Sequence, residues 1–115
     1  MATQNHIKRL LEWIELCTGQ TPAPEIKRAS SRYTWIAPGI VEFVDFKDCS
    51  EPVYITTRAI SARGLDFRSS RMPKPGCKLL ISLETCQGDM QIPATVMHST
   101  ESVGMALTGV RFDLD

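Results

Sequence analysis

The chain has 115 residues, of which 43% are hydrophobic and 23% are charged, the balance of one small globular domain rather than of a disordered segment. Thirteen basic residues match thirteen acidic ones, and this zero net charge argues against a dedicated nucleic-acid binder, which usually carries a basic excess. The four cysteines are widely spread, so we expect no zinc site and favour reduced thiols in a cytoplasmic protein. The first residues lack the apolar core of a signal peptide and no run approaches the length of a membrane span, so we expect neither.

An amphipathic helix is predicted first, followed by a proline-rich linker, so that residues 1–25 lead into a β domain at 26–115. The apolar residues that follow the spacing of one helix face are Ile7, Leu10, Leu11, Ile14 and Cys17. Trp13 and Leu16 are expected to widen this face. Thr3 or Asn5 can cap the start of this helix, and Gly19 stands where a helix usually ends. The apolar face can pack on the chain's own domain, or it can bind a partner or a second copy to give a homodimer.

Beyond Pro22 and Pro24, through which a helix cannot continue, the pattern changes to the period of two that is typical of strands. The expected strands are Gly39–Phe46, Val53–Ile60, Gly64–Phe67, Cys77–Glu84, Gln91–His98 and Gly104–Phe112. Pro93 cannot donate to a strand ladder, so we place it at a sheet edge or a bulge. Short strands separated by frequent turns predict a mainly β protein, with the six strands forming a small antiparallel barrel.

Two short stretches carry the candidate ligand-binding residues. Arg28 and Arg32 stand on the segment that leaves the linker, and a guanidinium group matches the geometry of phosphate oxygens. Farther on, Ser61, Arg63 and Gly64 fall in the turn between two expected strands. Turn amides can form a small anion-binding nest, and glycine suits a position of positive φ or of close backbone approach. The simpler interpretations are a solvated basic linker and an ordinary hairpin turn.

Catalysis is not expected from this sequence. It contains no nucleophile elbow, no glycine-rich phosphate loop and no zinc-protease motif. His98 lies near the end of an expected strand, where a structural or solvated histidine is the simpler interpretation. No pattern places a histidine beside a cysteine or gathers metal ligands. We therefore predict a binding protein that is not an enzyme and has no cofactor or metal.

Taken together, the two stretches resemble a PilZ domain. That family pairs an R-x-x-x-R motif with a D/N-x-S-x-x-G motif on its barrel, and "RASSR" (28–32) matches the first motif in full. "AISARG" (59–64) matches the second motif at Ser61 and Gly64 but has Ala59 at the Asp/Asn position. The stretches "GLDFRSSRMPKPGCKLLISL" and "IPATVMH…LTGVRF" are similar to the later strands of the family, so the likeness covers most of the chain.

The resemblance implies a six-stranded PilZ-like β-barrel and a bacterial signalling module that binds cyclic di-GMP and passes a change to an effector protein. By the same resemblance, Arg28 and Arg32 would clamp phosphates and guanine edges of the dinucleotide. Ser61 would hydrogen-bond the ligand, and Gly64 would let the backbone come close. A segment that folds over the ligand also provides a switch, since its bound shape differs from its free shape.

Ala59 is the departure from the family pattern, because alanine cannot bond the polar edge of a guanine. The loss of one neutral hydrogen bond costs about 1 kcal/mol, or more if a donor of the ligand is left buried and unpaired, so binding would weaken roughly ten-fold or more. Arg58 should point to the opposite face unless a bulge intervenes, and Arg63 in the turn is the other candidate to compensate.

Two alternatives to the sensor remain open. The first is a degenerate PilZ-like adaptor that no longer binds the dinucleotide and acts through protein contacts alone. The second is a small barrel for single-stranded nucleic acid, which needs aromatic stacking platforms on a basic face, whereas aromatic residues make up only 7% of this chain.

Overall fold

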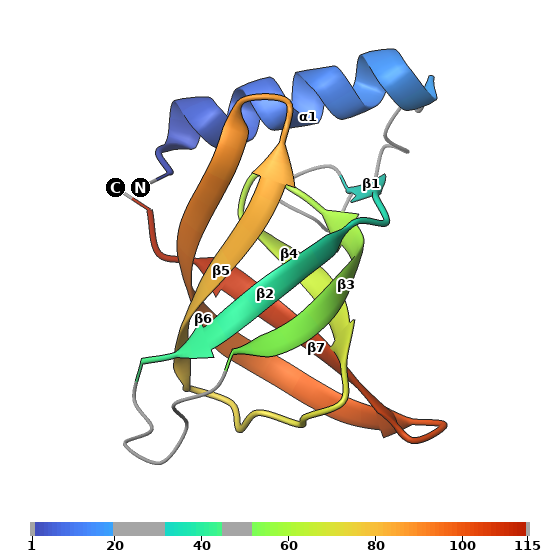
Figure 1. Cartoon of the computed structure of the whole chain (residues 1–115), viewed down its shortest axis with the longest axis vertical. Coiled ribbons are helices and arrows are strands. Elements are labelled where there is room, and N and C mark those ends of the chain that lie inside the picture. The colour runs from blue at the N-terminus through green and yellow to red at the C-terminus, as the bar shows by residue number, and fades with distance from the viewer. Residues whose placement is uncertain (1, 20–31, 45–51, 115) are drawn as a thin grey trace, which may run out of the picture.

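The computed structural model describes residues 2–19, 32–44 and 52–114. Arg28, most of the linker and the turn at 45–51 lie outside these described residues. The elements of the described chain, in order, are α1 (Gln4–Thr18), β1 (Tyr33–Thr34), β2 (Pro38–Phe43), β3 (Val53–Ile60), β4 (Gly64–Ser69), β5 (Lys78–Thr85), β6 (Gly88–Ser102) and β7 (Met105–Phe112) (Figure 1).

The strands close into the six-stranded antiparallel barrel that the sequence predicts (Figure 1). β3 pairs with β2 on one side and with β4 on the other, and the ring continues through β5, β6 and β7. The short β1, which was not predicted, pairs with the end of β3 beyond the last residue that β2 reaches. Side chains alternate along each strand between an apolar core and an outer wall, and the outer wall is where a ligand can approach.

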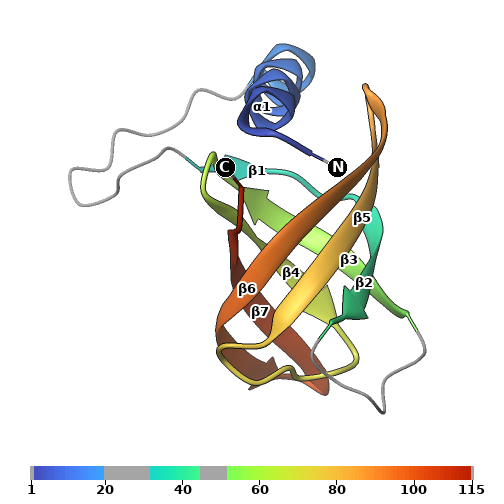
Figure 2. The same ribbon diagram turned by 90° about the vertical axis from the view of Figure 1, so that its left-hand side faces the viewer.

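Helix α1 lies across one end of the barrel, beside the β5–β6 hairpin (Figures 1 and 2). Thr3 caps its first turn through a capping box with His6, and Gly19 ends the helix in the left-handed region, as the sequence predicts for Thr3 and Gly19. In the part of the chain that the structure describes, no helix is both long and apolar enough to cross a membrane.

The apolar face of α1 packs on the chain's own barrel, which is the first of the two interpretations of this helix. Ile7, Leu10 and Ile14 are completely buried and join the same hydrophobic core as the strands. The wider apolar face predicted from the sequence is wrong, because Trp13 and Leu16 remain 40% and 84% exposed. Cys17, which was expected on the same face, is exposed as well. A straight helix resting on the barrel end buries only a narrow line of side chains.

Two polar contacts also tie α1 to the barrel. The Gln87 side chain, at the tip of the β5–β6 hairpin, donates to the carbonyl oxygen of His6 at 2.9 Å. The Tyr33 hydroxyl donates to Oε2 of Glu15 at 3.3 Å. Burial, followed by the charge and hydrogen bond of Glu15, raises the pKa of Tyr33 above its ordinary value, so Tyr33 stays a neutral donor at neutral pH.

One buried hydroxyl, together with backbone hydrogen bonds, holds the link between β1 and β2 against β3. Oγ1 of Thr57 accepts from the backbone N–H of Ala37 at 2.8 Å and donates to the carbonyl of Trp35 at 2.7 Å. Thr57 is completely buried, so these two backbone groups find their partner in the side chain where the strand is interrupted. This contact holds the chain that directly follows Arg32 and β1.

Replacing Thr57 with valine should lower the free energy of unfolding by about 2 kcal/mol, since valine keeps the volume but removes the partner of two partly buried backbone groups. The matched control is Thr56→Val at the exposed neighbouring position, where a change below about 0.5 kcal/mol is expected. Urea denaturation of both variants measures the difference. Equal effects would mean that the buried hydroxyl contributes no stability.

Pro93 lies neither on an edge strand nor at a bulge, which corrects the expectation from its sequence. It belongs to β6, between β5 and β7, and pairs with Leu80 on β5. Its carbonyl accepts from the backbone N–H of Asp113 at 2.8 Å, one residue beyond the end of β7. The ladder with β7 starts at Ala94, so the missing N–H of the proline falls where that ladder has already ended.

Candidate ligand-binding site

An open pocket of about 460 Å³ lies on the outer wall of the barrel, around the turn that joins β3 to β4. It brings together four of the five predicted site residues, which are Arg32, Ser61, Arg63 and Gly64. The fifth, Arg28, lies outside the described residues. Residues from the outer walls of β6 and β7 complete the lining.

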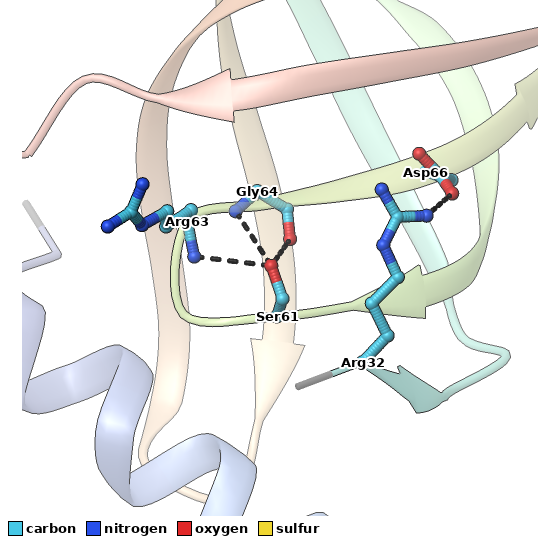
Figure 3. A network of polar contacts seen from close by, with 5 residues as sticks. All are labelled: Arg32, Ser61, Arg63, Gly64 and Asp66. Atoms are coloured by element: carbon cyan, nitrogen blue, oxygen red, sulfur yellow. Dashed lines mark hydrogen bonds and ion pairs between the residues drawn. The ribbon is translucent and has the colours of Figure 1, made fainter. Parts of the chain in front are cut away.

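Arg32 points into this pocket and pairs with Asp66 on β4 (Figure 3). Its Nη1 atom lies 2.8 Å from Oδ2 of Asp66, which makes a charge-assisted hydrogen bond. The two side chains are 45% and 29% exposed, so solvent screens the pair and it contributes at most about 1 kcal/mol to stability. An incoming anion can therefore take Arg32 from the carboxylate at modest cost.

The Ser61 hydroxyl is engaged within its own turn (Figure 3). It accepts from the backbone N–H groups of Arg63 and Gly64 at 3.2 and 3.3 Å, and donates to the carbonyl of Gly64 at 3.4 Å. Ser61 is only 7% exposed. The turn amides that were expected to form an open anion nest therefore bond the serine instead, and the hydroxyl shapes the turn.

Replacing Ser61 with alanine should lower the free energy of unfolding by about 1 kcal/mol, because two turn amides lose an acceptor that is partly shielded from water. Ser70→Ala, at an exposed position in the loop after β4, is the control and should change stability by less than about 0.5 kcal/mol. Chemical denaturation measures both. If Ser61→Ala leaves the free energy of unfolding unchanged, water replaces the hydroxyl without loss of stability.

Gly64 is required by the close approach of two strands. Its φ lies outside the left-handed region, so the first of the two reasons given for a glycine does not apply. A Cβ at this position would overlap the carbonyl oxygen of Val110 and lie 3.3 Å from Cα of Arg111 on β7. The second reason, close backbone approach, therefore holds, and it sets the spacing of β4 and β7 beneath the pocket.

A β-bulge in β3 places Arg58 on the same wall as Ala59. The register with β4 passes from Thr57 opposite Phe67 to Ala59 opposite Asp66, so Arg58 is the extra residue. Arg58 was expected to point to the opposite face unless a bulge intervened, and this bulge is present. Arg58, Ala59 and Asp66 line a smaller depression of about 300 Å³ next to the main pocket.

Three charged or titratable pocket residues were not among the predicted site residues: Asp66, His98 and Arg111. Asp66 could have been found by folding the sequence into a hairpin around the turn, which sets Asp66 opposite Ala59. His98 is exposed, which agrees with the interpretation of a solvated histidine. It also lines the pocket, because a second bulge, in β6, places it opposite Gly109. No periodic signal in the sequence reveals such a bulge.

The charge of the pocket favours an anionic ligand. Arg32, Arg63 and Arg111 line it, against the single carboxylate of Asp66. Arg63 extends from the tip of the turn away from Arg32, so the two guanidinium groups lie on different sides of the turn (Figure 3). Nη2 of Arg111 lies 3.7 Å from Oδ1 of Asp113, and the Arg111 side chain is 56% exposed. Several separated cations can contact an extended anion at more than one point.

No protein-family model and no curated protein matches the chain in sequence. Among solved structures, the chain is similar to the crystal structure of the PilZ domain of CeSA from a cellulose-synthesizing bacterium. The match has a TM-score of 0.59 and 19% sequence identity, and covers 75% of this chain and 83% of that chain. The chain has a PilZ-like fold. The fold predicted from two short motifs and a strand pattern is thereby confirmed.

Within this PilZ-like barrel, the described residues of both motifs meet at one pocket, although Arg32 precedes β1 and Ser61 follows β3. The pairing of β1 with the end of β3 brings them together, since Tyr33 lies opposite Ile60. Among the described residues of the PilZ-like barrel and its helix, no group of three or more His, Cys, Asp or Glu could hold a metal ion.

Proposed function

We propose that this PilZ-like domain is a signalling module that binds cyclic di-GMP, without catalysis, in the pocket formed by Arg32 and the Ser61–Gly64 turn. The observation that carries the proposal is the convergence of Arg32 and this turn on one open, arginine-lined pocket. The two stretches that resemble the PilZ motifs are distant in sequence. The pairing of β1 with β3 brings Arg32 next to the Ser61 turn, and this proximity supports a joint role in binding.

The chemistry of the ligand suits these residues. Cyclic di-GMP carries two phosphate charges and two guanines, and an arginine can pair with phosphate oxygens, read the O6/N7 edge of guanine or stack on its face. A pocket of about 460 Å³ is within the range of small-molecule sites. Arg28 would add a second guanidinium group from the segment before Arg32, as the R-x-x-x-R pattern implies.

The alternative is a PilZ-like adaptor that has lost the dinucleotide. The specific observation in its favour is Ala59, which faces this wall without a polar side chain. In that case the arginines would form part of a protein-binding surface, and the effector would be recognised without a second messenger.

Isothermal titration calorimetry of the whole chain with cyclic di-GMP separates the two functions. The sensor predicts a saturable heat with a dissociation constant in the micromolar range or below, which corresponds to about −8 kcal/mol or better. The heat should be strongly reduced in an Arg28→Ala variant. No heat at high micromolar dinucleotide would remove the sensor and leave the adaptor.

A further inference from the structure

Among the described residues that line the pocket, Asp66 is the one carboxylate, and the other charged residues are arginines. It projects from β4 between two buried neighbours, Leu65 and Phe67, and therefore onto the outer wall. It lines both the main pocket and the smaller depression beside it. A carboxylate here repels the anions that the arginines attract, so a ligand of this pocket must offer it something other than negative charge.

The two oxygens of Asp66 face different surroundings. Oδ2 accepts the hydrogen bond of Arg32 at 2.8 Å. Oδ1 lies toward Gly109, its partner on β7, where a Cβ would sit 3.0 Å from this oxygen and overlap the ring of His98. Because Gly109 has no side chain, it does not cover Oδ1 of Asp66. With 29% of its side chain exposed, Asp66 can hold Arg32 with one oxygen and meet a ligand with the other.

The matching ligand chemistry is a group with N–H donors next to acceptors or anionic groups. Guanine offers this combination, because its N1–H and 2-amino groups are adjacent donors and its O6 and N7 are acceptors. A carboxylate oxygen has two lone pairs, so Oδ1 of Asp66 can accept from both adjacent N–H groups while Oδ2 holds Arg32. Adenine has a single amino donor at that edge, beside the lone pair of N1, which a carboxylate repels.

We propose that Asp66 is the residue that selects guanine over adenine in this pocket, an inference that rests on the proposed binding of cyclic di-GMP. Its register partner Ala59 shares the wall but has no polar side chain for the task. Directly opposed side chains on antiparallel strands start about 5 Å apart, so Asp66 reaches the space beside Ala59. Arg32, held by the other oxygen, is then adjacent to the acceptors or phosphate of the same nucleotide.

The test compares cyclic di-GMP with cyclic di-AMP, which carry the same two phosphates and differ in their bases. The wild-type chain should bind cyclic di-GMP at least ten-fold more tightly, by about the cost of one mismatched hydrogen bond to a charged group. Asp66→Ala should lose about ten-fold or more in affinity for cyclic di-GMP and keep or gain affinity for cyclic di-AMP. Asp66→Asn, which keeps one acceptor oxygen but loses the charge, should fall between. Asp89→Ala, an exposed acid on β6 that does not line this pocket, is the control.

The outcomes separate the selector from the function on which it rests. A guanine-to-adenine ratio that stays at its wild-type value in both Asp66 variants would overturn the selector and leave Asp66 as the counter-ion of Arg32, with the proposed function intact. A wild-type chain that does not bind cyclic di-GMP overturns both. Thermal unfolding of each variant checks the fold, and the nearly isosteric Asp66→Asn decides the question if Asp66→Ala does not fold.

Discussion

Arg32→Ala should weaken the binding of cyclic di-GMP by at least about thirty-fold, or about 2 kcal/mol, while the barrel remains folded. Arg32 is the described arginine of the R-x-x-x-R stretch, and its guanidinium group points into the pocket beside the Ser61 turn. Its removal takes away a cation and also leaves Asp66 without its counter-ion, so the remaining carboxylate repels a doubly charged ligand more strongly.

Stability should change little in the same variant, because a partly exposed ion pair contributes at most about 1 kcal/mol. Calorimetry gives the affinity, and urea denaturation gives the stability. Arg9→Ala, on the exposed surface of α1 and outside the pocket, removes the same charge and is the control. Equal losses of affinity in the two variants would indicate a general charge effect and would remove the specific role of Arg32.

Gly64→Ala should lower the free energy of unfolding by about 3 kcal/mol, at the upper end of typical overpacking costs. The new Cβ would overlap the carbonyl oxygen of Val110, and backbone atoms cannot turn aside as a flexible side chain can. β4 and β7 would have to separate in the ladder that closes the barrel, beneath the pocket. Thermal and urea unfolding measure the loss.

Gly109→Ala is the matched control on the same pair of strands. Its Cβ would meet the ring of His98, which is exposed and can rotate away, and Oδ1 of Asp66 at 3.0 Å. The free energy of unfolding should therefore change by less than about 1 kcal/mol. Similar losses in the two variants would contradict the steric role given to Gly64.

Much of the barrel follows from the sequence because apolar residues alternate where a strand has one face in the core. The bounds of β3 were predicted to the residue, at Val53–Ile60. β1 was missed because two residues are too short to show a period. β6 was predicted to end at His98, but it continues to Ser102, since its last residues are largely exposed and polar and show no alternation.

The candidate site was predictable only in part. Arg32, Ser61 and Gly64 were named from their motifs, and the structure brings all three to one pocket. The position of Arg58 and the proximity of His98 depend on two β-bulges, which change strand register without a mark in the hydrophobic pattern. Pairing across strands, rather than order along the chain, sets such neighbours.

The central claim is that cyclic di-GMP occupies the pocket on the outer wall around the Ser61 turn. Chemical-shift mapping of the ¹⁵N-labelled chain during titration with the dinucleotide tests it most directly. We expect the largest shifts at the backbone amides of 59–61 and 63–66, at Met97 and His98, and at 109–111, which line the pocket. Saturable shifts confined to other parts of the barrel, or no shifts at high micromolar dinucleotide, would contradict the account.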